Sequence, residues 1–145
     1  MKIGIGNDRH AIDIKNNLTK YLTDKGYNVV NYGSDEESYA DYCDYAFKVG
    51  EDVASKKIDY GILICNTGIG MSIAANKVKG VRCAKVSDEY EAEMTRRDNN
   101  ANVLALGAHT DIKKMYKIVD IFLNTEYMSI DRYNRRLEKI DNYDS

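Results

Sequence analysis

The stretch that decides the fold reads Tyr60-Gly-Ile-Leu-Ile-Cys65, followed at once by Asn66-Thr-Gly-Ile-Gly70. Its first half is an unbroken apolar run, which is typical of a strand covered on both faces of a parallel sheet. Its second half is a glycine-rich turn, and the residues after it, up to about Lys77, are predicted to form a helix. A strand, a turn and a helix in this order indicate one unit of an α/β fold.

The same alternation of strand and helix continues on both sides of this stretch. Apolar patterns predict further strands at 3–6, 28–32, 81–86 and 103–106. Helical spacing predicts helices at about 14–25, 45–53, 88–97, 115–123 and 131–140, with Ser87 to Glu89 as the N-cap region of the third. We therefore expect a single domain, 1–145. It is a three-layer α/β/α Rossmann-like domain with a five-stranded parallel sheet and a C-terminal helix.

Composition argues against several classes of function. The chain has 145 residues, 43% of them hydrophobic, and a formal net charge of −2. Charges of both signs are interspersed, so no basic stripe indicates a nucleic-acid surface, and no apolar run approaches the roughly 20 residues that span a bilayer. Three cysteines without metal spacing predict neither a disulfide framework nor a zinc site. We expect a cytoplasmic protein without nucleic-acid or membrane partners.

Polar and glycine-rich clusters follow the predicted strands at the points where the strands end. In α/β folds of this kind the ligand site lies at the carboxyl ends of the strands, which share one edge of the sheet. The clusters at 7–10, 65–70, 87–88 and 107–109 all fall there. The sequence therefore predicts a functional site at this edge.

Cys65 and the turn after it form the first candidate site. Backbone N–H groups of 66–70 and the start of the next helix favour a bound anion, whether a phosphate, a carboxylate or a developing oxyanion. The same field favours a thiolate, and a thiolate beside such a turn suits removal of a proton next to a carbonyl. A cysteine that ends an apolar strand is also a common packing residue, as we expect for Cys43 and Cys83. The residues alone thus indicate only an anion-binding α/β domain.

Three segments resemble the ribose-5-phosphate isomerase B and galactose-6-phosphate isomerase family. They are 1–8, Gly61–Lys77 with its Cys-x-Thr-Gly-Ile-Gly…Ala-Ala-Asn-Lys pattern, and Asn102–Gly107, and the similarity covers nearly the whole chain. The resemblance implies an aldose–ketose isomerase that forms a cis-enediol intermediate and needs no metal or cofactor. It also implies a homodimer or homotetramer, or a hetero-oligomer with a second family member. In such an assembly the helix at about 131–140 packs on a partner subunit, and the partner completes each site.

The resemblance further implies roles for single residues. Cys65 is expected to move the proton between C1 and C2 of the sugar. The turn from Asn66 to Gly70 is expected to hold the enediolate oxygens, with Thr67 beside them as a further catalytic residue. Arg132 and Arg136 are expected to hold the phosphate, because two arginines four residues apart share one helix face. Composition alone would make this cluster, with Arg135, a solvated helix face. The other substrate-binding candidates are Asp8, Arg9, His10, Tyr42, Asn66, Gly68, Ile69, Gly70, Asn99 and His109.

Several positions depart from the family pattern, and they lie among the site candidates. Family members usually have histidine directly after Asp8, so here either Arg9 has replaced the imidazole or His10 supplies it from the next position. Asp98 stands where ribose-phosphate isomerases of this type carry the histidine thought to open the sugar ring. A carboxylate can accept a proton at this catalytic position, but it donates one only if its pKa is raised. His109 stands where the family commonly has arginine.

Three hypotheses follow. The first is an isomerase of ribose 5-phosphate and ribulose 5-phosphate, with galactose 6-phosphate and tagatose 6-phosphate, or another hexose or tetrose phosphate, as alternative substrates. The second is a subunit that needs another family member for activity, since Arg9, Asn66 and Asp98 depart from the family pattern. The third is a flavodoxin-like domain that binds FMN on the glycine-rich turn, which the absence of tryptophan disfavours.

Overall fold

The computed structural model describes residues 1–36 and 40–143, and it shows strands and helices in alternation. The strands are β1 (Lys2–Asn7), β2 (Asn28–Asn31), β3 (Tyr60–Cys65), β4 (Cys83–Lys85) and β5 (Val103–Gly107). The α-helices are α1 (Ile12–Asp24), α2 (Tyr42–Ala54), α3 (Ile69–Ala75), α4 (Glu89–Asn99), α5 (Ile112–Asn124) and α6 (Asp131–Asp141), and a short 3-10 helix covers Arg9–Ala11. The predicted order of elements is confirmed.

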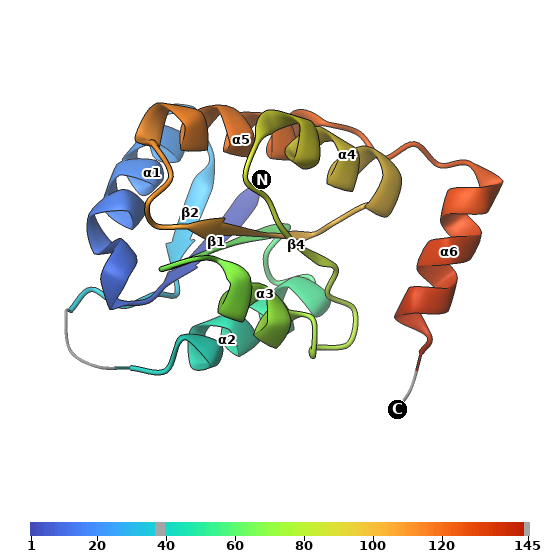
Figure 1. Cartoon of the computed structure of the whole chain (residues 1–145), viewed down its shortest axis with the longest axis horizontal. Coiled ribbons are helices and arrows are strands. Elements are labelled where there is room, and N and C mark those ends of the chain that lie inside the picture. The colour runs from blue at the N-terminus through green and yellow to red at the C-terminus, as the bar shows by residue number, and fades with distance from the viewer. Residues whose placement is uncertain (37–39, 144–145) are drawn as a thin grey trace.

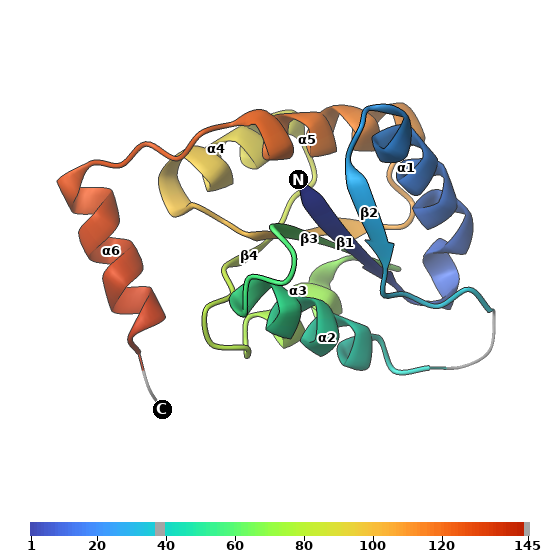
Figure 2. The same ribbon diagram turned by 180° about the vertical axis from the view of Figure 1, so that it is seen from behind.

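All strands run parallel, in the order β2-β1-β3-β5-β4. The register pairs Ile5 with Ile62 and Ile62 with Leu104, so β3 lies at the centre of the sheet. Helices α1, α4 and α5 cover one face and α2 and α3 cover the other (Figure 1 and Figure 2). This is the three-layer α/β/α architecture that the sequence predicts.

The central strand is buried on both faces, as its apolar run indicates. Ile62 and Ile64 pack in the core beneath α1, α4 and α5, whereas Leu63 and Cys65 pack in the core beneath α2 and α3. A slip of one residue along β3 would exchange these two faces, so the packing fixes the register of the strand. The position of Cys65 at the end of β3 is therefore set by the core.

β4 is shorter than the strand predicted over 81–86. The N–H of Val81 donates to the carbonyl oxygen of Val78 at 3.1 Å, and the N–H of Arg82 donates to the side chain of Asn102 at 2.8 Å. Because these N–H groups are engaged by a turn and a side chain, residues 81 and 82 donate no hydrogen bond to the backbone of β5. Val81 is buried nonetheless, which explains its apolar character.

The N-cap of α4 is Asp88. Its carboxylate accepts the N–H of Glu91 at 2.8 Å and so satisfies one of the free donors in the first turn. Ser87 lies one residue before the cap, where its N–H and its hydroxyl both donate to the carboxylate of Glu91 at 2.7 Å. The predicted N-cap region is therefore correct, and Asp88 is the residue that performs the capping.

The C-terminal helix stands apart from the three layers. Figure 1 and Figure 2 both show α6 beyond the edge of the sheet, joined to α5 by the extended segment 125–130. Leu137 is its one buried residue. A pocket of about 500 Å³ lies between α6 and the segment 76–84. The helix thus covers little of the domain that carries it.

Candidate active site

The carboxyl ends of β1, β3 and β5 meet at one edge of the sheet. Asn7 pairs with Ile64, and Cys65 pairs with Gly107. Beyond the strands, the N–H of Asp8 donates to the carbonyl of Ile64 at 3.2 Å and that of Ala108 donates to the carbonyl of Cys65 at 2.8 Å. These bonds bring the three predicted clusters at 7–10, 65–70 and 107–109 together.

The turn after β3 wraps around the sulfur of Cys65. The N–H of Gly68 donates to Cys65 Sγ at 3.1 Å, and the N–H of Ile69 donates to Thr67 Oγ1 at 3.1 Å. Cys65 is only 5% exposed, whereas Thr67 and Ile69 face outward. A backbone donor aimed at the sulfur stabilises negative charge there, which suits a cysteine that accepts a proton.

Gly68 is the residue that permits this turn. Its φ of 81° is a left-handed conformation, and a Cβ on it would lie 2.8 Å from the carbonyl carbon of Leu106 in β5. Both the conformation and the close approach require glycine. The turn is therefore held against β5, which keeps its N–H groups beside the sulfur.

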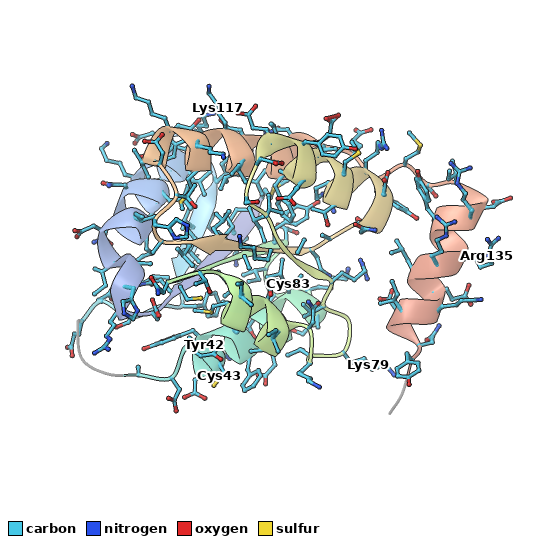
Figure 3. The ribbon with its side chains drawn as sticks, viewed as in Figure 1. Tyr42, Cys43, Lys79, Cys83, Lys117 and Arg135 are labelled. Atoms are coloured by element: carbon cyan, nitrogen blue, oxygen red, sulfur yellow. The ribbon has the colours of Figure 1, made fainter. Side chains whose placement is uncertain are left out.

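Tyr42 lies against the glycine-rich turn from the start of α2. A Cβ on Gly70 would lie 2.6 Å from Cε1 and 2.9 Å from the hydroxyl oxygen of Tyr42, so the ring lies directly beside Gly70. Figure 3 shows Tyr42 where α2 begins, near α3. The side chain is 42% exposed. Tyr42 thus forms one wall beside the turn, where the sequence predicts a substrate-binding residue.

Asp8 and His10 form a pair at the end of β1. The carboxylate of Asp8 accepts the N–H of His10 at 3.0 Å and lies 3.0 Å from His10 Nδ1. Asp8 is 7% exposed, while Arg9 and His10 are exposed. The pair therefore presents its imidazole toward solvent and keeps its carboxylate oriented.

Asn7 supports this pair and was not singled out as a candidate residue. It is fully buried, and its Nδ2 donates to the carbonyls of Asp8 and Ser34, both at 2.9 Å. It thereby ties the end of β1 to the loop after β2. The available signal in the sequence is a polar residue at the end of an apolar strand, directly before Asp8.

His109 and Asn66 meet on the other side of the turn. Nδ1 of His109 lies 3.2 Å from the carbonyl oxygen of Asn66. Both side chains are exposed. A Cβ on Gly107 would lie 2.9 Å from the ring of His109, so the imidazole packs over the end of β5. The structure thus places His109 at the same edge as Cys65.

The other candidates do not reach this edge within one chain. Helix α4 begins after the carboxyl end of β4 and ends before the amino end of β5. Asp98 and Asn99 therefore lie near the amino ends of the strands, whereas Cys65 lies at a carboxyl end. Arg132 and Arg136 lie on α6, and α6 contacts α4. The structure therefore divides the predicted site residues into two groups.

Asp98 is held by a neighbouring arginine. Nε of Arg97 donates to its Oδ1 at 2.8 Å. This hydrogen bond, with smaller contributions from Tyr133 and Arg132, lowers the pKa of the Asp98 carboxyl below its ordinary value. Asp98 is therefore ionised at neutral pH and can accept a proton but has none to donate.

Arg132 and Arg136 are exposed on α6, four residues apart. Their positions share a face of the helix, which suits two-point binding of a phosphate. The guanidinium of Arg132 lies 5.0 Å from the centre of the Tyr133 ring. Arg135 projects away from the domain (Figure 3).

The remaining cysteines differ from Cys65. All three cysteines are free, and Cys43 and Cys83 are half-buried. Burial raises the pKa of the Cys83 thiol to about 12, so this thiol stays protonated. In the ranges 1–36 and 40–143, no cluster of His, Cys, Asp and Glu could hold a metal ion, and no helix has the length and apolarity to cross a membrane.

Comparison with known proteins identifies relatives along nearly the whole chain. Residues 3–140 match the family described as Ribose/Galactose Isomerase. The chain is 38% identical to ribose-5-phosphate isomerase B of Escherichia coli, over 96% of this chain and 93% of that protein. It is 42% identical to D-erythrulose-4-phosphate isomerase of Pectobacterium atrosepticum, over 88% of this chain and 85% of the relative.

Two further comparisons concern subunit composition and the fold. The chain is 37% identical to the galactose-6-phosphate isomerase subunit LacB of Clostridium acetobutylicum, over 97% of this chain and 82% of the relative. Among solved structures, ribose-5-phosphate isomerase B of Clostridium thermocellum superposes with a TM-score of 0.94 at 42% identity, over 97% of this chain and 95% of the other. The fold is thus shared with this solved structure.

Proposed function

Since this chain belongs to the ribose/galactose isomerase family, we propose that it interconverts ribose 5-phosphate and ribulose 5-phosphate through a cis-enediol intermediate. That the chain is a sugar-phosphate isomerase follows from its family and its relatives. The observation that carries the proposed chemistry is the sulfur of Cys65, which the N–H of Gly68 holds at 3.1 Å beside the glycine-rich turn. The relative from Escherichia coli supports the choice of a five-carbon substrate.

We infer that Cys65 moves the proton between two carbons of the open-chain sugar. Its thiolate takes the proton from C2 of the aldose, and negative charge develops on the oxygen of C1. N–H groups of the turn 66–70 stabilise that charge, because the first turn of α3 leaves N–H groups without helical partners. Those of Gly68 and Ile69 already donate to Cys65 Sγ and Thr67 Oγ1, so the others of the turn take this role. The proton of the C2 hydroxyl passes to the oxygen of C1, and Cys65 returns its proton to C1, which gives the ketose. Asp8 and Tyr42 bind sugar hydroxyls beside it.

We propose that the working form is a homodimer in which α6 of one chain serves the site of the other. Arg132 and Arg136 lie far from Cys65 in their own chain, yet they are the residues suited to bind the phosphate. Ile140 in the last turn of α6 and Tyr143 just after it are 59% and 80% exposed, and with Lys139 they line one apolar pocket. A partner surface would cover them and bring both arginines to the thiol. A homotetramer of such dimers is compatible with the same contact.

The first experiment measures turnover of the purified chain with ribose 5-phosphate, beside Cys65→Ala and Cys83→Ala. Loss of the proton-transfer group is expected to lower kcat by about 10³-fold or more, while binding of the sugar phosphate changes little. Cys83→Ala is the matched control, because this protonated cysteine lies away from the turn, and it should turn over like the wild type. Wild-type turnover by Cys65→Ala would refute the proposed role of the thiol.

A four-carbon sugar phosphate is a second candidate substrate, favoured by the state of Asp98. Ribose 5-phosphate closes to a furanose ring, and an enzyme that accelerates the opening of that ring needs a group that protonates the ring oxygen. The Arg97 guanidinium keeps Asp98 ionised and so unable to protonate that oxygen. A tetrose 4-phosphate cannot close a furanose ring, because its O4 carries the phosphate. The similarity to D-erythrulose-4-phosphate isomerase supports this candidate.

Comparing kcat/KM for erythrose 4-phosphate, ribose 5-phosphate and galactose 6-phosphate separates the candidates. A preference for the four-carbon substrate would assign Asp98 as a residue of specificity. Asp98→His is then expected to raise kcat/KM for ribose 5-phosphate and to leave the four-carbon reaction nearly unchanged. A preference of the wild type for ribose 5-phosphate would exclude the four-carbon sugar as its main substrate.

A third possibility is that the chain is a subunit that is active only together with a second family member, and the similarity to LacB supports it. Its signature is a purified chain that binds sugar phosphates but turns over none of the three sugars, and that gains activity only when another family member is added. Turnover by the pure chain would exclude this possibility.

We propose a cytoplasmic location for the enzyme. All three cysteines are unpaired in the structure, as is usual for proteins that work in a reducing compartment.

A further inference from the structure

Helix α6 carries the two proposed phosphate-binding arginines, yet it has few contacts with the domain. Only Leu137 is buried, and the segment 125–130 that leads to the helix has neither helical nor strand structure. Figure 2 shows the helix standing clear of the sheet. A helix with so little buried surface is not held rigidly by packing on its own domain. Within one chain, the direction of α6 is therefore set by specific bonds.

Two such bonds lie near the two ends of this C-terminal arm, and between them Tyr133 of α6 interacts with the Asp98 carboxyl on α4. Before the helix, the N–H of Met128 donates to the carbonyl of Arg97 at 2.9 Å. In its last turn, Asp141 accepts from Nη1 of Arg82 through both carboxylate oxygens, each at 3.0 Å. Of the ion pairs between α6 and the rest of the chain in the part that the structure describes, Arg82–Asp141 is the only one.

Arg82 is itself held firmly. Its N–H donates to the side chain of Asn102 at 2.8 Å, and its Nε donates to the carbonyl of Asn100 at 3.1 Å. Its carbonyl accepts the N–H of Asn102 at 2.9 Å. The side chain is 18% exposed, against 38% for Asp141. The arginine is therefore a fixed point at the start of β4, and the aspartate attaches the helix to it.

The ion pair between Arg82 and Asp141 lies beside a pocket. Arg82 and Asp141 both line the pocket of about 500 Å³ between α6 and the segment 76–84, together with Leu137 and Ile140. The ion pair lies along this pocket beside Leu137, the one buried residue of α6.

Resting on the proposed function, we propose that Arg82 is a positioning residue for phosphate recognition, because its ion pair with Asp141 fixes α6 and thereby aims Arg132 and Arg136. Without this ion pair the helix is held only toward its other end, where Met128 is bonded to Arg97. At 1.5 Å per residue, Arg132 lies about 3 Å and Arg136 about 9 Å along the helix from Ile130. A tilt of about 10° then moves Arg136 by about 1.6 Å and Arg132 by about 0.5 Å, which disturbs a two-point contact with a phosphate.

The test compares Asp141→Asn and Arg82→Gln with the wild type in steady-state kinetics on the sugar phosphate that it turns over. Each variant is expected to raise KM about tenfold, and to raise the inhibition constant of inorganic phosphate in parallel, while kcat stays within about twofold. Exchanging the charges, with Arg82→Asp and Asp141→Arg in one chain, should recover most of the loss. Asp24→Asn breaks an exposed ion pair with Lys20 elsewhere and is the matched control, with wild-type kinetics expected.

Three results would overturn the proposal. They are an unchanged KM in Asp141→Asn, a fall in kcat at constant KM, and a KM that varies with enzyme concentration, which would assign the pair to assembly. Arg132→Ala and Arg136→Ala are measured in the same series. If these raise KM and Asp141→Asn does not, only the positioning role fails. If they leave KM unchanged, the assignment of the phosphate site in the proposed function fails.

Discussion

Lys15 is a charged residue that lies inside the molecule. Its side chain is 2% exposed, on α1. Its Nζ donates to the carbonyl of Ser34 and to the side chain of Asn31, each at 3.3 Å, and forms an ion pair with Asp35. Asp35 is 66% exposed. One member of the pair is therefore buried, and the other lies at the surface.

The two members of this pair are expected to respond differently to removal. Lys15→Met replaces a buried ammonium by an apolar chain of similar length, and the Ser34 carbonyl keeps a donor in Asn7. Its free energy of unfolding should stay within about 1 kcal/mol of the wild type. Asp35→Ala leaves the buried ammonium without its carboxylate and should destabilise the protein more. Urea denaturation of both variants tests this order.

The double variant distinguishes this explanation from a general loss of contacts. Adding Lys15→Met to Asp35→Ala removes the unpaired charge, so the double variant should be more stable than Asp35→Ala alone. Additive losses would contradict the burial argument.

Single residues of the site were predictable to different degrees. Cys65 and the turn 66–70 were predictable, because a site at the carboxyl edge follows from the alternation of strands and helices. The phosphate-binding role proposed for Arg132 and Arg136 was not, since their spacing alone is equally typical of a solvated helix face and only the family resemblance points to phosphate. Outside the site, nothing in the sequence indicates that Lys15 is buried, because its burial depends on the loop with Ser34 and Asp35, which lies elsewhere in the sequence.

At the scale of elements, Tyr32 at the end of β2 is tied to Asp52 on α2. The hydroxyl of Tyr32 donates to the Asp52 carboxylate at 2.6 Å. Burial and this hydrogen bond raise the pKa of Tyr32 from 10.0 to about 12, and the same bond lowers the pKa of Asp52. Because the folded chain keeps the tyrosine proton where the unfolded chain has lost it, this contribution is complete below pH 10 and disappears as the pH rises toward 12.

This gives a test in alkaline solution. The free energy of unfolding of the wild type should fall between about pH 10 and pH 12 more steeply than that of Tyr32→Phe, which has no such proton. Tyr143→Phe is the matched control, because Tyr143 is 80% exposed, and it should follow the wild type. Identical slopes in all three chains would show that the bond between β2 and α2 does not carry the effect.

Element types were predictable and element ends less so. The limits of β3 agree with the prediction at both ends, because the apolar run stops abruptly at Asn66. β4 was overestimated, because Val81 is buried but lies in a turn rather than in the ladder. Hydrophobic periodicity reports burial, and a buried residue next to a strand cannot be told from a residue within it.

At the scale of the whole molecule, the domain ends in effect before α6. The five strands and α1 to α5 form both core layers without it, and Leu137, the one buried residue of α6, belongs to neither layer. A chain ending at residue 126 should therefore keep its circular-dichroism spectrum and melt within a few degrees of the wild type. In the proposed dimer it would lose both the contact and the arginines, so its sedimentation should be monomeric and its turnover absent. Collapse of the spectrum would instead make α6 part of the fold.

In the proposed dimer, Cys65 and the two arginines of each site belong to different chains, and this affects how mutations in two alleles combine. Suppose that a cell carries one allele with Cys65→Ala and a second with Arg132→Ala and Arg136→Ala. Each mixed dimer then has one site that receives both lesions and one that receives none, so about a quarter of all sites are intact when the chains pair at random. Two alleles that fail separately thus complement each other, an outcome that a self-contained site does not allow.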